Sequence, residues 1–119
     1  MRVLLVEDHV DSAVSVGRLL RALGYEVRLA FDGVEGLQSA TEFQPAAVFI
    51  DLSLPRLDGF SVATRIRAMD GMQGARLIAV AGWESDDCVA RARAAGFDMH
   101  LVKPLSLRML TDALATARC

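Results

Sequence analysis

The stretch Val3-Leu4-Leu5-Val6-Glu7-Asp8 decides the fold class of this 119-residue chain. Four apolar residues run without interruption, and two acids follow them directly. A strand that is apolar at successive positions is buried on both faces, which is typical of a parallel sheet. Similar, largely apolar runs recur at Val27–Ala30, Ala46–Ile50, Leu77–Ala81 and Met99–Val102. The sequence therefore predicts five short buried strands.

Segments with helical spacing separate these strands and follow the last one. Apolar residues recur every three or four positions at about 10–23, 34–42, 59–69, 86–95 and from 107 to 117. Helix-ending glycines and helix-starting serines mark several of their boundaries: Gly24, Gly96, Ser85 and Ser106. Five strand–helix pairs in alternation predict an α/β fold, a three-layer sandwich with a five-stranded parallel sheet.

Composition excludes several broad classes of protein. Thirteen basic and fifteen acidic residues nearly balance, whereas a sequence-blind nucleic-acid binder needs a basic surface. No apolar run approaches the roughly 20 residues of a membrane helix, and acids follow the first short run too soon for a signal peptide. Cys88 and Cys119 suggest two free thiols in a reducing cytoplasm. We expect one domain over residues 1–119, with no output domain.

Charged residues interrupt the apolar pattern at the end of three strands. Glu7 and Asp8 follow the first strand, Asp51 follows the third, and Lys103 follows the fifth. Lys103 is the single lysine beside twelve arginines, which suggests a specific need for an ammonium group. The carboxyl ends of parallel strands share one sheet edge, where ligands bind at the point at which strand order reverses. If the first and third strands are neighbours, the three acids converge.

Converging carboxylates need a positive partner. Two unit charges about 5 Å apart repel by roughly 3 kcal/mol at an effective dielectric constant of about 20. Oxygen donors without His or Cys favour Mg²⁺, and Lys103 adds a second positive charge. This combination suits an incoming phosphoryl group, whose oxygens the cations neutralise while a carboxylate attacks phosphorus. Taken singly, Glu7-Asp8 also fits a helix cap, and Asp51 also fits an ordinary turn acid.

Several motifs together resemble the receiver domain of two-component response regulators. They are Val3-Leu4-Leu5-Val6-Glu7-Asp8, Asp51-Leu52-Ser53-Leu54-Pro55 with Asp58-Gly59, and Lys103-Pro104. The resemblance covers essentially the whole chain. It implies a flavodoxin-like (βα)5 fold with a doubly wound sheet in strand order 2-1-3-4-5. The segment from Gly96 to Pro104 further resembles receivers of hybrid histidine kinases.

The resemblance also implies a role for each site residue. Asp51 is then the phosphoacceptor, and Lys103 pairs with a phosphoryl oxygen that the backbone N–H of Gly82 also binds. The Mg²⁺ ligands are Asp8 and Asp51 through their carboxylates, Glu7 largely through water, and Ser53 through its backbone carbonyl. The Lys103–Pro104 peptide bond is expected to be cis.

Two positions depart from the family pattern. Ala81 stands at the end of the fourth strand, where receivers usually carry the Thr or Ser whose hydroxyl binds a phosphoryl oxygen. His100 stands at the second switch position, which is usually Tyr or Phe. A missing hydrogen bond to a charged group removes about 1.5–3 kcal/mol of coupling. The alternative reading is an atypical receiver that binds its partner regardless of phosphorylation. Trp83, two residues after Ala81, is expected to overhang the site.

The expected partner is a sensor histidine kinase or a histidine phosphotransfer protein, with neither nucleic acid nor membrane bound directly. A weak homodimer through the fourth helix, fifth strand and fifth helix is a further expectation. The only chemistry expected is the domain's own aspartyl phosphorylation and dephosphorylation. An aspartyl phosphatase is a poor alternative because Ser53 occupies the place of its second acid. A flavin carrier is equally poor because no phosphate-cradling loop follows the first strand.

Overall fold

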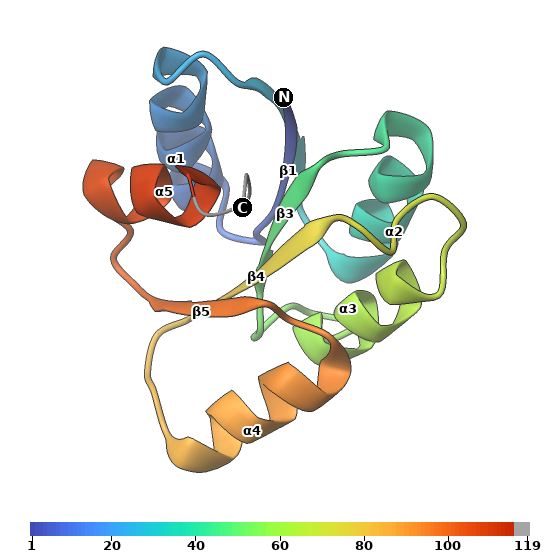
Figure 1. Cartoon of the computed structure of the whole chain (residues 1–119). Helices are drawn as coiled ribbons and strands as arrows, with labels where there is room; N and C mark the ends of the chain where they lie inside the picture. The colour runs from blue at the N-terminus through green and yellow to red at the C-terminus, as the bar shows by residue number, and fades with distance from the viewer. Residues whose placement is uncertain (116–119) are drawn as a thin grey trace.

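A computed structural model describes residues 1–115 as a five-stranded parallel sheet with helices on both faces (Figure 1). The strands are β1 (Arg2–Val6), β2 (Glu26–Ala30), β3 (Ala47–Asp51), β4 (Arg76–Ala81) and β5 (Met99–Val102). They lie in the order β2-β1-β3-β4-β5, which confirms the flavodoxin-like order expected from the sequence. The first and third strands are therefore neighbours, with Val6 paired to Ile50.

Five helices cover the sheet. They are α1 (Val10–Ala22), α2 (Gly33–Phe43), α3 (Gly59–Arg67), α4 (Asp86–Ala95) and α5 (Leu107–Ala115). Figure 1 shows α1 and α5 together on one side of the sheet, with α2, α3 and α4 on the other. Among residues 1–115, no helix combines the length and the apolar character that crossing a membrane requires.

Alternation along β3 shows why a central strand is almost entirely apolar, whereas the edge strands β2 and β5 are only partly buried, contrary to the prediction of five buried strands. Ala47 and Phe49 belong to the core beneath α1 and α5, whereas Val48 and Ile50 belong to the core beneath α2, α3 and α4. All four are fully buried. Successive side chains of a strand point to opposite faces, so a strand covered by helices on both sides has no solvent-facing position.

The helix ends follow the predicted capping residues. Ser85 Oγ accepts a hydrogen bond from the Cys88 amide, and Ser106 Oγ accepts one from the Met109 amide, each at 3.1 Å. The Gly96 residue that ends α4 has a φ of 108°, a left-handed conformation that glycine adopts without strain. The predicted α5 position Ala117 lies outside the described residues, as does Cys119.

The third helix ends two residues before its predicted end. The pattern predicts a helix to about Met69, but α3 ends at Arg67. The amides of Ala68 and Met69 donate to Arg65 and Ile66 three residues back, so the chain tightens there into a turn.

Candidate functional site

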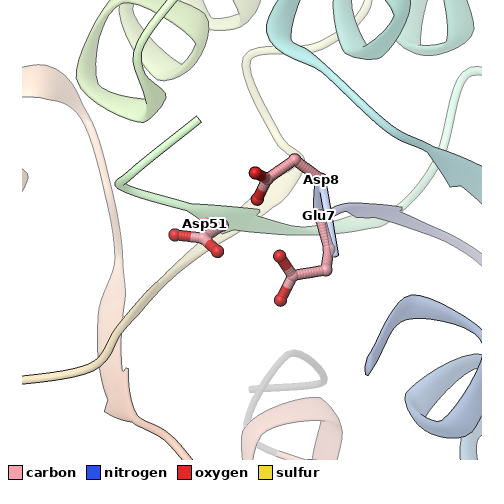
Figure 2. A group of neighbouring side chains, drawn as sticks. All are labelled: Glu7, Asp8 and Asp51. Carbon is pink, nitrogen blue, oxygen red and sulfur yellow. The ribbon is translucent and has the colours of Figure 1, made fainter. Parts of the chain in front are cut away.

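The strand order brings the predicted acids to one edge of the sheet. Glu7 and Asp8 directly follow β1, and Asp51 is the last residue of the neighbouring β3. β1 also pairs with β2 on its other side, so strand order reverses here, as at the ligand sites of other open α/β sheets. Figure 2 shows the three side chains emerging from these two strand ends.

The three carboxylates lie close enough to share a cation. One oxygen from each of Glu7, Asp8 and Asp51 lies within 4.8 Å of the others. Glu7 and Asp51 are buried, at 5% exposure each, while Asp8 is exposed. Hard oxygen donors with an exposed member fit Mg²⁺, which binds through one or two carboxylates and keeps several waters. The Ser53 carbonyl remains a predicted ligand.

A glycine lets α3 begin against this acidic edge. A Cβ on Gly59 would lie 2.5 Å from the carbonyl oxygen of Asp51, so a larger residue would displace the strand end. Asp58 caps the same helix by accepting a hydrogen bond from the Ser61 amide at 3.0 Å. The Asp58-Gly59 pair therefore fixes the approach of α3 to Asp51.

Lys103 reaches the acids from the end of β5. Its Nζ lies 2.7 Å from Oε1 of Glu7 and 2.8 Å from Oδ2 of Asp51. Its backbone N–H donates to the carbonyl of Ala81, which anchors the end of β5 to the end of β4. The Lys103–Pro104 peptide bond is cis, which confirms the sequence prediction. The single lysine thus neutralises part of the acidic cluster.

The buried acids differ in how readily they ionise. Burial and the neighbouring Asp51 raise the pKa of Glu7 above its usual value, although Lys103 acts against the rise. Burial also acts on Asp51, but hydrogen bonds from Lys103, Glu7 and the Ser53 amide outweigh it and lower its pKa. Asp51 is therefore the carboxylate that the fold keeps ionised, as a nucleophile must be.

The same contacts raise the pKa of Lys103. Burial acts to lower its pKa, but the hydrogen bonds to Asp51 and Glu7 and the charges of both acids raise it overall. The ammonium form is therefore favoured within the acidic cluster. It supplies a positive charge next to the oxygen of Asp51.

The two departures from the family pattern occupy distinct surroundings. Ala81 is fully buried at the end of β4, and its methyl group offers no hydrogen bond. Gly82 follows it and lines a cleft of about 560 Å³ together with Glu7, Asp51 and Lys103. Trp83 is 56% exposed on the loop between β4 and α4, and its overhang of the site remains a prediction.

His100 has a partner that the sequence did not indicate. Its Nδ1 lies 3.3 Å from Oε1 of Glu84, in the loop between β4 and α4. Sequence reasoning overlooked Glu84 because this contact joins residues 16 positions apart and no motif contains it. The available signal was an acid one residue beyond Trp83, in the loop that borders the site.

A larger cavity, of about 750 Å³, lies at the opposite edge of the sheet. Arg67 lies there with its guanidinium bound to the carbonyls of Gly96, Gln73 and Ala75 and to the carboxylate of Asp98. These bonds join α3 to the loops around β4 and β5. The structure therefore assigns Arg67 a structural role, and the chemistry belongs to the acidic edge.

Comparison with known proteins relates the chain to one family. The family model described as the response regulator receiver domain matches residues 3–115. The transcriptional regulatory protein PrrA of Mycobacterium tuberculosis is 45% identical over 109 residues, which are 92% of the chain and 46% of PrrA. The chain therefore spans about half the length of that relative.

Solved structures share the fold over almost the whole chain. The chemotaxis protein CheY4 of Vibrio cholerae superposes with a TM-score of 0.93 at 26% identity, covering 98% of this chain and 97% of that one. The receiver domain of sensor histidine kinase PA1611 from Pseudomonas aeruginosa gives 0.89 at 31% identity, covering 97% and 94%. That structure has a magnesium ion coordinated in its active-site cleft.

Proposed function

The chain belongs to the receiver-domain family of two-component response regulators, and from this premise we propose that it accepts a phosphoryl group on Asp51 in a Mg²⁺-dependent reaction. The proposed donor is a phosphohistidine of a sensor histidine kinase or a histidine phosphotransfer protein. The observation that carries the proposal is the position of Lys103 Nζ, within 2.8 Å of both Glu7 and Asp51 at the rim of the acidic cleft.

Each residue of the site has a separate role in the proposed phosphoryl transfer. An oxygen of the ionised Asp51 forms the new bond to phosphorus while the P–N bond of the donor breaks, and its electron pair stays on the imidazole nitrogen. Lys103 pairs with a phosphoryl oxygen, and the amide of Gly82 donates to another. Asp8 and Asp51 through their carboxylates, Glu7 largely through water, and the Ser53 carbonyl would hold Mg²⁺, which would neutralise phosphoryl charge when bound.

The proposal sets limits on what the domain does. Its own aspartyl phosphorylation and dephosphorylation are its only reactions, so it is not an enzyme acting on a separate substrate. We place it in the cytoplasm with its kinase, and the buried free thiol of Cys88 suits that reducing compartment. We further propose that the domain forms a weak homodimer through α4, β5 and α5. The resemblance of its Gly96–Pro104 segment to receivers of hybrid histidine kinases extends the proposal to a place within such a kinase.

Treatment with a small phosphodonor tests the proposal directly. Intact mass analysis should detect one added phosphoryl group when Mg²⁺ is present and none when a chelator replaces it. The Asp51→Asn variant should remain unmodified, while Asp70→Asn, an exposed acid in the turn after α3, should react like the wild type. Phosphorylation of Asp51→Asn, or failure of the folded wild type with every donor, would refute the assignment.

The fully buried methyl group of Ala81 favours a second candidate function. In this alternative the domain binds its partner whether or not Asp51 is phosphorylated. Ala81 has no hydroxyl that could draw the next loop toward a phosphoryl oxygen, so the two states differ little. Equal affinity of a partner for both states means no population shift.

Beryllofluoride with Mg²⁺ is a suitable probe of this alternative, because it imitates a bound phosphoryl group. If the alternative holds, amide NMR shifts in the wild type stay near Asp51, whereas in Ala81→Ser they extend to α4 and β5. Shifts that already reach α4 and β5 in the wild type would favour a working switch instead.

A further inference from the structure

An ion pair between Glu84 and His100 joins the loop after β4 to the last strand. His100 Nδ1 lies 3.3 Å from Glu84 Oε1. The imidazole is 10% exposed, whereas the side chain of Glu84 is 63% exposed. A largely buried histidine thus contacts an acid on a surface loop, and the strength of the contact depends on whether the imidazole carries a proton.

The position of His100 in β5 explains its burial. Met99 and Leu101 pack into the core beneath α1 and α5, so His100 points to the opposite face, beneath α4. Val89 and Ala92 of α4 line a cavity of about 60 Å³ beside it. Within the described part of the chain, Nε2 has no hydrogen-bond partner. Among the described residues, the contact to Glu84 is therefore the polar anchor of the ring.

Charged groups around His100 make Glu84 the compensating acid. Arg93 of α4 lines the cavity next to His100 and also the groove at Glu84, so it opposes a second positive charge. Asp98 lines the same cavity, but its carboxylate already accepts from Arg67 and from the Leu77 amide. On β4, the residue paired with His100 is the apolar Ala79.

The tethered loop borders the acidic cleft. Lys103 N–H donates to the Ala81 carbonyl, which fixes the start of the loop. Gly82, the next residue, lines the cleft with Asp51 and Lys103. Glu84 lies two residues further along, so its contact with His100 is a second attachment of the same loop to β5.

We propose that Glu84 and His100 form a proton-controlled latch on the loop between β4 and α4. With the imidazole protonated, the ion pair holds the loop against β5. Loss of the proton leaves one hydrogen bond from a neutral donor, and the loop opens more often. The latch itself is independent of phosphoryl transfer; its consequence for phosphoryl binding at Gly82 rests on the proposed function.

Trp83 and the small number of histidines make a direct test available. Trp83 is the single tryptophan, and His9 is the other histidine of the chain. We scan the full chain across the general histidine range of about pH 5 to 8 and expect a change in Trp83 fluorescence that coincides with the NMR signal change of the His100 ring. The protection factor of the Cys88 amide, which donates to Ser85, should fall about two- to five-fold across this range, as expected for a partly exposed ion pair.

Matched variants identify the pair responsible. The transition should disappear in Glu84→Gln and in His100→Gln, and persist in His9→Gln and in Asp86→Asn, which removes a neighbouring acid. A flat Trp83 signal in the wild type, or a transition that survives Glu84→Gln, overturns the latch. Glu84 is exposed, so its variant keeps the test decisive even where His100→Gln fails to fold. These measurements contain no phosphodonor, so their outcome is separate from that of the phosphorylation assay.

Discussion

The ammonium of Lys103 lies 2.8 Å from Oδ2 of Asp51, although β4 separates the strands that carry them. The lysine side chain therefore reaches across the end of that middle strand, whose last residue is the buried Ala81. The same ammonium lies 2.7 Å from Glu7. The Lys103 ammonium thus pairs with two buried acids, but the pKa of Asp51 is lowered whereas the pKa of Glu7 is raised.

The two acids should therefore respond oppositely to neutralisation. At pH 7 without Mg²⁺, we expect Glu7→Gln to raise the free energy of unfolding by up to about 1 kcal/mol, because the site disfavours its charge. Asp51→Asn should lower the free energy by roughly 1–2 kcal/mol, because it loses charged hydrogen bonds with Lys103 and the Ser53 amide. Urea unfolding in a chelating buffer measures both. Changes of the same sign would contradict the unequal roles.

The effects of Glu7→Gln and Asp51→Asn on the free energy of unfolding should each change with pH in a defined direction. The pKa of Glu7 is raised by folding, so its favourable contribution is complete below about pH 4.3, the ordinary value, and is lost as pH rises through the folded value. The stabilisation by Glu7→Gln should therefore be greatest at pH 7 and shrink toward pH 4. Urea unfolding at several pH values measures this trend.

Asp51 gives the opposite trend. Its pKa is lowered by folding, so its contribution is present above about pH 3.9 and is lost as pH falls through the folded value. The destabilisation by Asp51→Asn should persist at pH 5 and decline only in stronger acid. A penalty that grows as the pH is lowered from 5 would show that Asp51 is not held ionised.

Arg67 offers a prediction about the scaffold. Its guanidinium donates to three backbone carbonyls and to Asp98, a set of bonds that an ammonium cannot reproduce. We expect Arg67→Lys to lower the free energy of unfolding by about 2–4 kcal/mol. Arg65→Lys, on the exposed side of the same helix, should change it by less than about 0.5 kcal/mol. Thermal and urea unfolding of both variants provide the comparison.

The fold was predictable because short segments of the sequence carry the signals for each strand and for each helix end. Each buried strand is an apolar run, and residues such as Ser85 and Gly96 mark helix ends with their own backbone preferences. The convergence of Glu7, Asp8 and Asp51 was also predictable, because parallel strands bring their carboxyl ends to one edge. Geometry of this kind needs only the order of the strands.

Contacts between side chains on different elements were not predictable in the same way. The pattern indicated that Lys103 would meet a phosphoryl group, but not that its ammonium binds Glu7 directly. Nor did it pair Glu84 with His100, since that contact depends on the path of one loop. The spacing of apolar residues indicates which face of a helix or strand a residue occupies. The residue that its side chain contacts on another element depends also on the side-chain rotamer.

Asp8 provides the test that separates metal binding from the stability of the empty site. It is the exposed member of the acidic cluster, whereas Lys103 forms its ion pairs with Glu7 and Asp51. We therefore expect Asp8→Asn to leave the melting temperature in a chelating buffer within about 2 °C of the wild type, the shift that a change of less than about 0.5 kcal/mol produces.

Millimolar Mg²⁺ should raise the melting temperature of the wild type, because a ligand of the folded state stabilises it in proportion to the logarithm of its concentration over Kd. It should also change Trp83 fluorescence, and Asp8→Asn should lose both effects while Asp70→Asn retains them. If Asp8→Asn binds Mg²⁺ as tightly as the wild type by calorimetry, then Asp8 is not a ligand and the ion lies elsewhere.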